Sequence, residues 1–548
     1  MFRLLVICFF TPLLMLAQPA QHKYFLRFKD KNGSTFSVSD PSAFLSARAI
    51  ARRSAQNIPI ITGDLPVNSN YINSVNSMGA TVLTRSKWFN GLTIECDSSV
   101  LASVLSLPFV VSAKRIFIQT NSGQSKQLYE DFPLKLNSPL RILNYDYGGS
   151  FNQIHMMNGE FLHEEGFTGD GMLIALLDAG FYSVNQLPAF DSIRNQNHII
   201  ATWDFVSGDS SVYEDDSHGM SVLSTIAGNV PGQLIGTAPN ASFLLLRTED
   251  VNSENIIEEY NWEAGAEFAD SAGADVISSS LGYTEFDDPL TNHVYSDMDG
   301  NHCPSSIAAD LAVSKGILVL TSAGNSGNNP WHYISAPSDG DSVLSIGAVN
   351  SNGNHVSFSS WGPSSDGDVK PNLASQGLNC TLADAWGGVS TGSGTSFACP
   401  ILAGAATCLW QAFPALTAMQ IKSAIERSAN YYFAPNDTLG YGIPDFRLAS
   451  YILSTGNGLL PAKDDVIGVY PNPFSENLNV RFFSTTSQTV KLEMINAIGQ
   501  IISSRNENAL ARSVNTYTIS NDNNLKNGFY FVRVSTAEGN IVNKVLKY

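Results

Sequence analysis

Cysteine is scarce in this chain of 548 residues: the sequence holds six, and Cys8 lies in an apolar N-terminal segment. No CxxC pair and no His/Cys motif accompanies the others, so the sequence predicts no bound metal. Five cysteines are also too few to hold a disulfide-built scaffold together. These five are Cys96, Cys303, Cys380, Cys399 and Cys408.

Spacing restricts how these cysteines can pair. If residues 396–412 form one helix, Cys399 and Cys408 lie about 13.5 Å apart along its axis. That exceeds the roughly 7 Å that a disulfide spans between Cα atoms, so these two cannot pair. A bridge between Cys303 and Cys380 is permissible in an oxidising compartment, and it stands as a hypothesis.

Basic residues are in the minority. The chain has 31 Lys and Arg against 49 Asp and Glu, which gives a formal net charge of -18. This balance opposes a general affinity for nucleic acid phosphates or anionic membranes, so we expect no nucleic acid partner. Hydrophobic residues make up 43% of the chain, enough for a large core. The length predicts about three or four domains.

Long apolar runs are absent beyond the N-terminus, since no later segment supplies about 18 uninterrupted apolar residues. Residues 1–17 carry Arg3 and then an apolar run, and small and polar residues follow. This pattern is typical of a secretory signal peptide, with cleavage after Ala17 or Ala20. We therefore expect a soluble, exported mature protein.

Four further segments differ in pattern. Residues 22–120 mix short strand and helix signals and predict a small α+β domain. Residues 121–149 are polar without a clear period, which suits an exposed, cleavable linker. Residues 150–455 predict an α/β domain. Residues 464–548 return to alternating strands and predict a small β-sandwich.

Within residues 150–455, short continuous apolar runs alternate with helical segments. One helix is indicated over residues 253–274, where Ile256, Tyr260 and Ala264 recur on one face. Strands that are buried on both faces and separated by helices predict a parallel sheet. The predicted strands are residues 172–178, 242–247, 275–282, 316–325 and 342–349.

Polar or small residues end several of these strands, where ligands bind in open α/β sheets. Asp178, Gly282 and Asn325 end three strands, and His218 opens a short helix in "DSHGMSVLSTIAG". Ser396 lies in "TGSGTSFACP", where it begins a helical apolar run. Alone, each polar residue has a structural interpretation as a turn former or helix N-cap. Their conjunction at one edge of a sheet predicts a catalytic site.

These residue types suit acyl transfer. A Ser hydroxyl becomes a nucleophile when a neutral imidazole takes its proton, and a carboxylate must hold that imidazole in the right tautomer. A side-chain amide and the backbone N–H of the nucleophile can donate to the oxyanion that forms. A helix N-terminus adds the positive end of its dipole near the same charge.

The order Asp, His, Ser in "DAG", "SHG" and "GTSFACP" resembles the subtilisin-like serine proteases, the subtilase family. "GTAPNASFLLLR", "VISSSLG", "SAGN" and "VSFSSWGPSSDGDVKPNLASQG" are similar to supporting segments of that family. The resemblance covers roughly residues 150–455. It implies Asp178 as the orienting carboxylate, His218 as general base and then acid, Ser396 as nucleophile and Asn325 as oxyanion donor.

The same resemblance implies a secreted endopeptidase that hydrolyses peptide bonds through an acyl-enzyme. The backbone of Ser280, Leu281 and Gly282 would pair with an extended substrate by strand addition. No cofactor is required for this chemistry. The family's calcium sites have no identifiable ligand set here. Two departures stand out: Ala179 replaces the usual Ser or Thr, and "HGMSVLSTIAG" replaces "HGTHVAG".

The flanking segments fit the same family. Residues 22–120 resemble its propeptides, which assist folding and block the cleft until they are removed. The tail resembles the sorting domain of type IX secretion, through "VYPNPFSENLNV", "INAIGQII", "LKNGFYFVRVSTAEGN" and "KVLKY". This implies export by a Gram-negative cell to the outside or to its surface, with the type IX machinery and the chain's own propeptide as partners.

Two alternatives remain open. In the first alternative, the chain is a catalytically silent surface binding protein or adhesin on a subtilisin-like scaffold. Against it, inactive relatives are expected to lose at least one of the four polar residues Asp178, His218, Asn325 and Ser396, and all four are present. In the second alternative, the tail is a carbohydrate-binding β-sandwich rather than a sorting domain. Substrate specificity and the propeptide cleavage site, between about residues 118 and 150, cannot be derived from the sequence.

Overall fold

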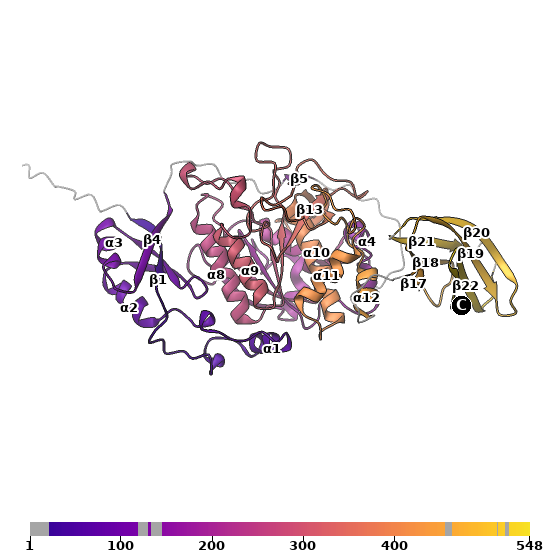
Figure 1. Ribbon diagram of the computed structural model, residues 1–548, viewed down its shortest axis with the longest axis horizontal. Helices are drawn as coiled ribbons and strands as arrows, with labels where there is room; N and C mark the ends of the chain where they lie inside the picture. Colours follow the sequence, from indigo (N-terminus) through magenta and orange to yellow (C-terminus); the bar gives the residue numbers. More distant parts are fainter. Residues whose placement is uncertain (1–20, 119–129, 133–144, 455–462, 512, 521–524) are drawn as a thin grey trace, which may run out of the picture.

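The computed structural model describes residues 21–118, 130–132, 145–454, 463–511, 513–520 and 525–548. The predicted signal peptide and most of the predicted linker lie outside the described residues. Figure 1 shows three bodies in a row: an N-terminal domain, a large central domain and a C-terminal β-domain. None of the described helices has the length and apolar character needed to cross a membrane.

The central domain is built on a seven-stranded sheet in the order β14-β13-β12-β11-β6-β10-β7, and every neighbouring pair is parallel. This confirms the predicted parallel sheet; the sequence patterns did not predict the two edge strands. All seven carboxyl ends therefore lie along one edge. The strands are β6 (Leu173–Asp178), β7 (Ile199–Asp204), β10 (Ser242–Arg247), β11 (Val276–Ser279), β12 (Leu318–Ser322), β13 (Leu344–Val349) and β14 (Leu373–Gln376).

Helices cover both faces of this sheet and create two cores (Figure 1). Side chains alternate along a strand, so Leu176 enters the core with α7 and α10, while Leu177 enters the core with α8 and α9. The helices are α4 (Phe151–His155), α5 (Glu160–Glu164), α6 (Asp191–Asn195), α7 (His218–Ala227), α8 (Ile257–Ala272), α9 (Pro304–Ser314), α10 (Thr395–Ala412), α11 (Ala418–Ser428) and α12 (Phe446–Ser454).

The two cores explain why the bridge between Cys303 and Cys380 is wrong. All five cysteines of the described residues are free thiols. Cys303 packs in the core of α8 and α9, whereas Cys380 packs in the core of α7 and α10. The seven-stranded sheet lies between the two cores, so the thiols cannot meet.

The N-terminal domain is a four-stranded sheet in the order β2-β3-β1-β4 with helices packed on it, as the α+β prediction requires. Residues 41–55 do not form one continuous helix, because Ser46 caps a new helix by accepting a hydrogen bond from the Ala49 N–H at 3.0 Å. The elements are β1 (His22–Phe28), α1 (Ala47–Ala55), α2 (Ser69–Ser77), β2 (Thr81–Ser86), β3 (Gly91–Cys96), α3 (Ser98–Leu105) and β4 (Val110–Phe117), with short 3-10 turns at Pro41–Ala43 and Thr62–Asp64.

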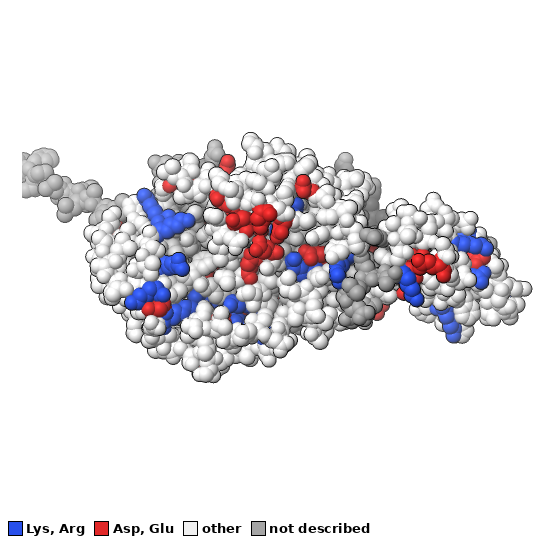
Figure 2. All heavy atoms as spheres, in the orientation of Figure 1, with Lys and Arg blue, Asp and Glu red and all other residues white. Residues whose placement is uncertain are grey.

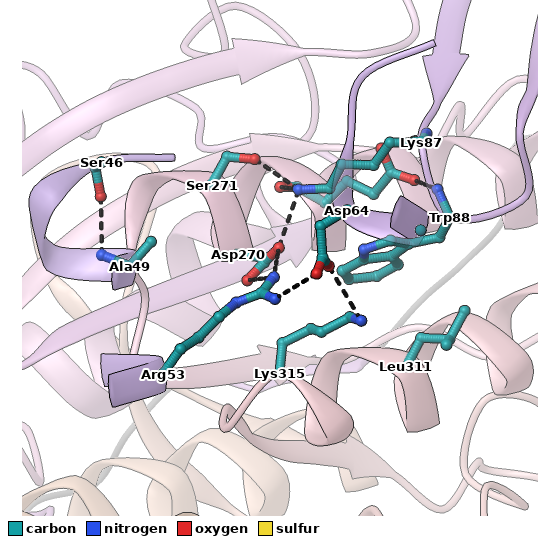
Figure 3. Close-up of polar contacts among 12 residues, drawn as sticks. Ser46, Ala49, Arg53, Asp64, Lys87, Trp88, Asp270, Ser271, Leu311 and Lys315 are labelled. Atoms are coloured by element: carbon teal, nitrogen blue, oxygen red, sulfur yellow. Dashed lines mark hydrogen bonds and ion pairs between the residues drawn. The ribbon is translucent and has the colours of Figure 1, made fainter. Parts of the chain in front are cut away.

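The N-terminal domain docks on α8 and α9 through a buried group of charges, which we call the interdomain charge cluster (Figure 3). Asp270 of α8 receives the Arg53 guanidinium at 2.8 Å and the Lys87 ammonium at 2.9 Å. Packing adds to this contact, because Phe25 of β1 stacks on Tyr260 of α8 at 4.3 Å between ring centroids. The cluster comprises Arg52, Arg53, Asp64, Lys87, Asp270 and Lys315.

The chain beyond the N-terminal domain also contacts the central domain. The Ile118 N–H donates to Asn255 Oδ1 at 3.0 Å. Further on, β5 (Glu130–Phe132) pairs antiparallel with β16 (Val389–Ser393) in a small sheet of order β15-β16-β5. Strand β15 is Cys380–Ala383, and a two-stranded hairpin joins β8 (Asn229–Val230) to β9 (Leu234–Ile235).

The C-terminal domain has two antiparallel sheets, β17-β18-β21 and β20-β19-β22-β23, whose apolar faces share one core. This agrees with the predicted β-sandwich. Arg447 of α12 joins it to the central domain, since its guanidinium lies 3.7 Å from the Tyr470 ring centroid. The strands are β17 (Asp465–Tyr470), β18 (Asn477–Ser484), β19 (Gln488–Asn496), β20 (Ile501–Ala509), β21 (Ser513–Ser520), β22 (Gly528–Thr536) and β23 (Gly539–Lys547).

Candidate active site

Asp178 and His218 meet at the carboxyl edge of the central sheet. Asp178 is the last residue of β6, His218 is the first residue of α7, and His218 Nδ1 lies 2.7 Å from Asp178 Oδ1. Gly219 makes this approach possible, because a Cβ there would lie 2.9 Å from the Asp178 Cβ and 2.4 Å from the Gly180 carbonyl oxygen. Only glycine therefore lets α7 begin against the end of β6.

The electrostatics of this pair follow from its burial. Burial alone would lower the pKa of His218, but the Asp178 carboxylate and its hydrogen bond outweigh that effect and raise it. The backbone N–H of Ala179 also donates to Asp178 Oδ1, at 2.8 Å. That contact gives the carboxylate a donor although a Ser or Thr hydroxyl is missing at position 179.

Ser396 stands at the start of α10, although not as its N-cap. The N-cap is Gly394, so Ser396 is the second residue of the helix, and its side chain is 4% exposed. The interpretation of Ser396 as the helix N-cap is therefore wrong, and Ser396 is buried. The Ser396 hydroxyl donates to the Ser280 carbonyl at 3.4 Å, and the Ser280 hydroxyl donates to the Ser396 carbonyl at 2.8 Å.

Asn325 lies beside Ser396 and is held by the same helix. Its Oδ1 accepts from the Thr395 N–H at 2.9 Å and from the Thr395 hydroxyl at 3.0 Å. With the carbonyl side engaged, the Nδ2 amide lies 3.6 Å from the position that a Gly394 Cβ would occupy, and the Ser396 Cβ lies 3.8 Å from that same position. The donor end of the amide and the serine therefore flank Gly394. The sequence patterns missed the role of Thr395, although "GTS" contains it.

The segment Ser280, Leu281 and Gly282 follows β11 at the same edge. The Leu281 side chain is buried in the core of α8 and α9, so only its backbone can meet a ligand. Gly282 is exposed, and a Cβ there would lie 2.3 Å from Ser335 Oγ. The segment therefore offers main-chain groups rather than side chains to a partner.

Strand β16 runs directly into this site, since it ends at Ser393 and α10 begins at Thr395. Its edge pairs with β5, with Gly392 opposite Asp131 and Ser393 opposite Glu130. A segment of the predicted linker thus adds a strand beside β16, the strand that leads into the helix of Ser396. The polar, aperiodic linker sequence gave no signal for this pairing.

Acidic side chains gather on the exposed face of the central domain (Figure 2). Carboxylates of the exposed residues Asp341, Asp366 and Asp368 come within 4.8 Å of one another, and those of Glu249, Glu254 and Glu258 do so in a more buried place. Oxygen-only sets suit calcium in principle. Acidic groups alone do not define a site, so structural calcium stays an expectation.

A family model described as the Subtilase family matches residues 169–442. The chain belongs to the subtilase family. The match spans β6, α7 and the start of α10, so it includes Asp178, His218, Asn325 and Ser396. The subtilase domain is flanked by matches to the Peptidase S8 propeptide domain of Bacteroidota over residues 23–130 and to the secretion system C-terminal sorting domain over residues 468–548.

Curated relatives of this subtilase are subtilisins and alkaline proteases. Subtilisin E of Bacillus subtilis (strain 168) is 30% identical over 282 residues, which is 51% of this chain and 65% of that protein. Subtilisin of Bacillus pumilus is 29% identical over 282 residues, 51% of this chain and 90% of that protein. Among solved structures, MycP1 from the ESX-1 type VII secretion system matches with 21% identity and a TM-score of 0.44, covering 60% of this chain and 93% of that chain.

The sorting domain decides the destination of the chain. Its match begins within β17 and covers the rest of the β-sandwich, and it confirms the resemblance to the tail of type IX secretion substrates. The protein is therefore exported to the outside of the cell or to its surface.

Proposed function

We propose that this subtilase is a serine endopeptidase with the triad Asp178, His218 and Ser396. The observation that carries the proposal is the 2.7 Å contact between His218 Nδ1 and Asp178 Oδ1 at the carboxyl edge of a parallel sheet. A carboxylate on Nδ1 fixes the tautomer that leaves Nε2 as the proton acceptor. The relatives named as subtilisins and alkaline proteases support the same chemistry.

The reaction proceeds by acyl transfer. Ser396 Oγ attacks the substrate carbonyl while His218 Nε2 takes its proton, and the tetrahedral oxyanion accepts hydrogen bonds from Asn325 Nδ2 and the Ser396 N–H. The imidazolium then protonates the leaving amine, which leaves an ester on Ser396. Water attacks that ester with His218 again as base, releasing the acid product and restoring the serine.

Protein or peptide chains are the proposed substrates. An extended substrate would add to the backbone of Ser280, Leu281 and Gly282, the segment that follows β11 and in which Gly282 is exposed. Since Ser280 also contacts Ser396 through two hydrogen bonds, the binding segment and the nucleophile are held in fixed relation.

The N-terminal domain is the proposed inhibitor of the same chain. The family match over residues 23–130 supports a propeptide role, and the ion pairs of the interdomain charge cluster support the proposal that this domain is held on the enzyme. Asp270 has three cationic partners, Arg52, Arg53 and Lys87, all supplied by the propeptide. Type IX export machinery is the proposed partner of the tail.

A fluorophosphonate probe tests the catalytic proposal. The processed wild-type protein should become labelled and should cleave a casein substrate, whereas a Ser396→Ala variant should do neither. Equal labelling of both proteins, or no cleavage by the wild type, would support the silent binding protein instead. For the tail, deletion of residues 464–548 should abolish export; normal export with lost glycan binding would support the carbohydrate-binding alternative.

A further inference from the structure

A second group of reactive side chains lies away from the triad, in the layer of α8 and α9. Glu259 of α8, His293 of the loop between β11 and α9, and Cys303 at the N-cap of α9 each point one ligand atom at the others. A carboxylate oxygen, a ring nitrogen and the sulfur all lie within 4.8 Å of one another. We call this group the Glu-His-Cys cluster, and the proposed mechanism uses none of it.

The oxygen and nitrogen of the cluster are held in place by neighbours. Glu259 Oε1 accepts from the Ser305 hydroxyl at 2.8 Å, while Glu259 Oε2 lies 2.9 Å from His293 Nε2. The backbone N–H of His293 donates to the Thr284 carbonyl at 2.8 Å, and the Phe286 ring packs edge-on against the imidazole at 5.2 Å between centroids. These contacts orient both donors before any ligand arrives.

The sulfur is buried and lies in negative surroundings. Cys303 is fully buried, and its Sγ donates weakly to the Asp297 carbonyl at 3.7 Å. Burial raises the pKa of the thiol, and the charges of Glu259, Asp339 and Asp297 raise it further. A cation among these groups would favour the thiolate instead, because a coordinating thiol loses its proton to the metal.

We propose that Glu259, His293 and Cys303 bind a zinc ion, with a fourth position left for water. A mixed set of sulfur, nitrogen and oxygen donors suits Zn²⁺, whereas Ca²⁺ and Mg²⁺ take oxygen ligands. Zinc lies about 2.0 to 2.3 Å from such donors. The three ligand atoms, which lie within 4.8 Å of one another, would therefore rearrange around the ion, and the contact between His293 Nε2 and the Glu259 carboxylate would be replaced by bonds to the metal. Binding releases two protons, one from the Cys303 thiol and one from His293 Nε2, which faces the Glu259 carboxylate, and leaves the remaining ring hydrogen on Nδ1. The Asp297 carboxylate lies on that side, 4.0 Å away.

The position of the cluster suggests what the metal does. His293 lies 34 residues from Glu259 in sequence, so no short sequence motif indicates the site. The metal would join α8 to the loop that follows the substrate-binding segment, and that loop begins directly after Gly282. Zinc would thereby stiffen one wall of the cleft without taking part in the reaction.

Cobalt and zinc titrations test the proposal. The full chain is used in a Ser396→Ala background so that it stays intact, and Co²⁺ serves as a spectroscopic probe in place of Zn²⁺. One Co²⁺ per chain should bind with a thiolate-to-cobalt charge-transfer band, and stoichiometric Zn²⁺ should displace it. Cys303→Ser should abolish the band. His293→Gln should weaken binding about tenfold or more.

Cys380→Ser is the matched control, because it removes a buried thiol from the other core and should leave the band unchanged. Circular dichroism shows whether each variant is folded, and His293→Gln keeps the test decisive if Cys303→Ser unfolds. Failure of the parent chain to bind one metal ion, or unchanged binding in a folded Cys303→Ser or His293→Gln variant, would overturn the site.

Discussion

Thr395 donates two hydrogen bonds to the carbonyl end of the Asn325 amide, one from its backbone N–H at 2.9 Å and one from its hydroxyl at 3.0 Å. Thr395 immediately precedes the proposed nucleophile, so the residue that precedes the serine also orients the oxyanion donor. A rigid donor costs no reorganisation when the negative charge develops.

This contact predicts graded losses of activity. Asn325→Ala should lower kcat by about 10² to 10³-fold with little change in KM, because it removes a donor used in the transition state. Thr395→Val keeps the backbone donor but loses the hydroxyl, which donates to Asn325 Oδ1 and also accepts from the Gly324 N–H at 3.3 Å. The lost bond to Asn325 is worth about 1 kcal/mol, so kcat should fall about threefold to tenfold. Thr407→Val is the control, since its hydroxyl bonds only within α10. Steady-state kinetics on a peptide substrate decide this, and an unchanged kcat for Asn325→Ala would contradict the assignment.

The His218 pKa predicts a pH profile. Because the Asp178 carboxylate raises that pKa above 6.5, the base is protonated and inactive at acid pH. The acid limb of kcat/KM should therefore lie above pH 6.5, with activity gained as pH rises through the raised pKa. Asp178→Asn should lower kcat by about 10⁴-fold, as a triad without its carboxylate does. An acid limb well below pH 6.5 in the wild type would contradict the prediction.

Gly219 predicts a steric effect. Gly219→Ala would bring a methyl group to 2.4 Å from the Gly180 carbonyl oxygen and 2.9 Å from the Asp178 Cβ. Helix α7 must then shift away from β6, so we expect a lower unfolding temperature and a loss of kcat/KM of more than tenfold. Gly468→Ala is the control, because a Cβ there meets open space. If Gly219→Ala matches this control in both measurements, the close approach is not required.

The interdomain charge cluster predicts how firmly the propeptide is held. Asp270→Asn leaves Arg52, Arg53 and Lys87 buried without their shared carboxylate, a change that typically costs about 3 to 5 kcal/mol. The uncleaved chain should unfold at a lower temperature, and protease activity should appear earlier than in the wild type. Asp191→Asn removes an exposed pair with Arg194 and should change neither measurement. Identical activation of both variants would show that the cluster does not hold the propeptide.

Glu263 predicts that the stability of the uncleaved chain decreases as the pH rises, whereas the His218 pKa predicts an activity that increases. Burial and the neighbouring Glu267 raise the pKa of Glu263 well above its usual value, while the Ser86 hydroxyl donates to its Oε1 at 2.7 Å. Protonated Glu263 therefore stabilises the folded chain. This contribution to the free energy of unfolding is complete below pH 4.5 and is lost as the pH rises through the raised pKa. Glu263→Gln, which mimics the protonated form, should raise the unfolding temperature of the uncleaved chain at pH 8 and leave it unchanged at pH 4. A decrease at pH 8 would contradict this sign.

The sequence predicted the parts of this fold that depend on burial along a strand or helix. Continuous apolar runs marked the inner strands of the sheet, and polar residues at their ends marked Asp178 and Asn325. The edge strands β7 and β14 were missed, since they lack long apolar runs. The cap of α10 was misjudged because the choice between Gly394 and Ser396 depends on backbone angles that a Gly-rich stretch leaves open.

Long-range contacts could not be predicted from the sequence for a different reason. The partners of Asp270 come from two places in the N-terminal domain, helix α1 and the residue after β2. The Glu-His-Cys cluster joins residues from a helix, a loop and a helix N-cap. Neither group has a fixed spacing, so only the folded chain brings its members together. Likewise, the incompatibility of Cys303 with Cys380 became visible only when a sheet was found between them.

The course of the chain from Ile118 on the central domain to β5 beside β16 has a kinetic consequence. An inhibitor joined to its enzyme by a short linker acts at an effective concentration in the millimolar range, whatever the total protein concentration. A single cut in that linker turns an intramolecular complex into a bimolecular one. Occupancy then depends on dilution, so export into a large external volume would itself complete the activation of this subtilase.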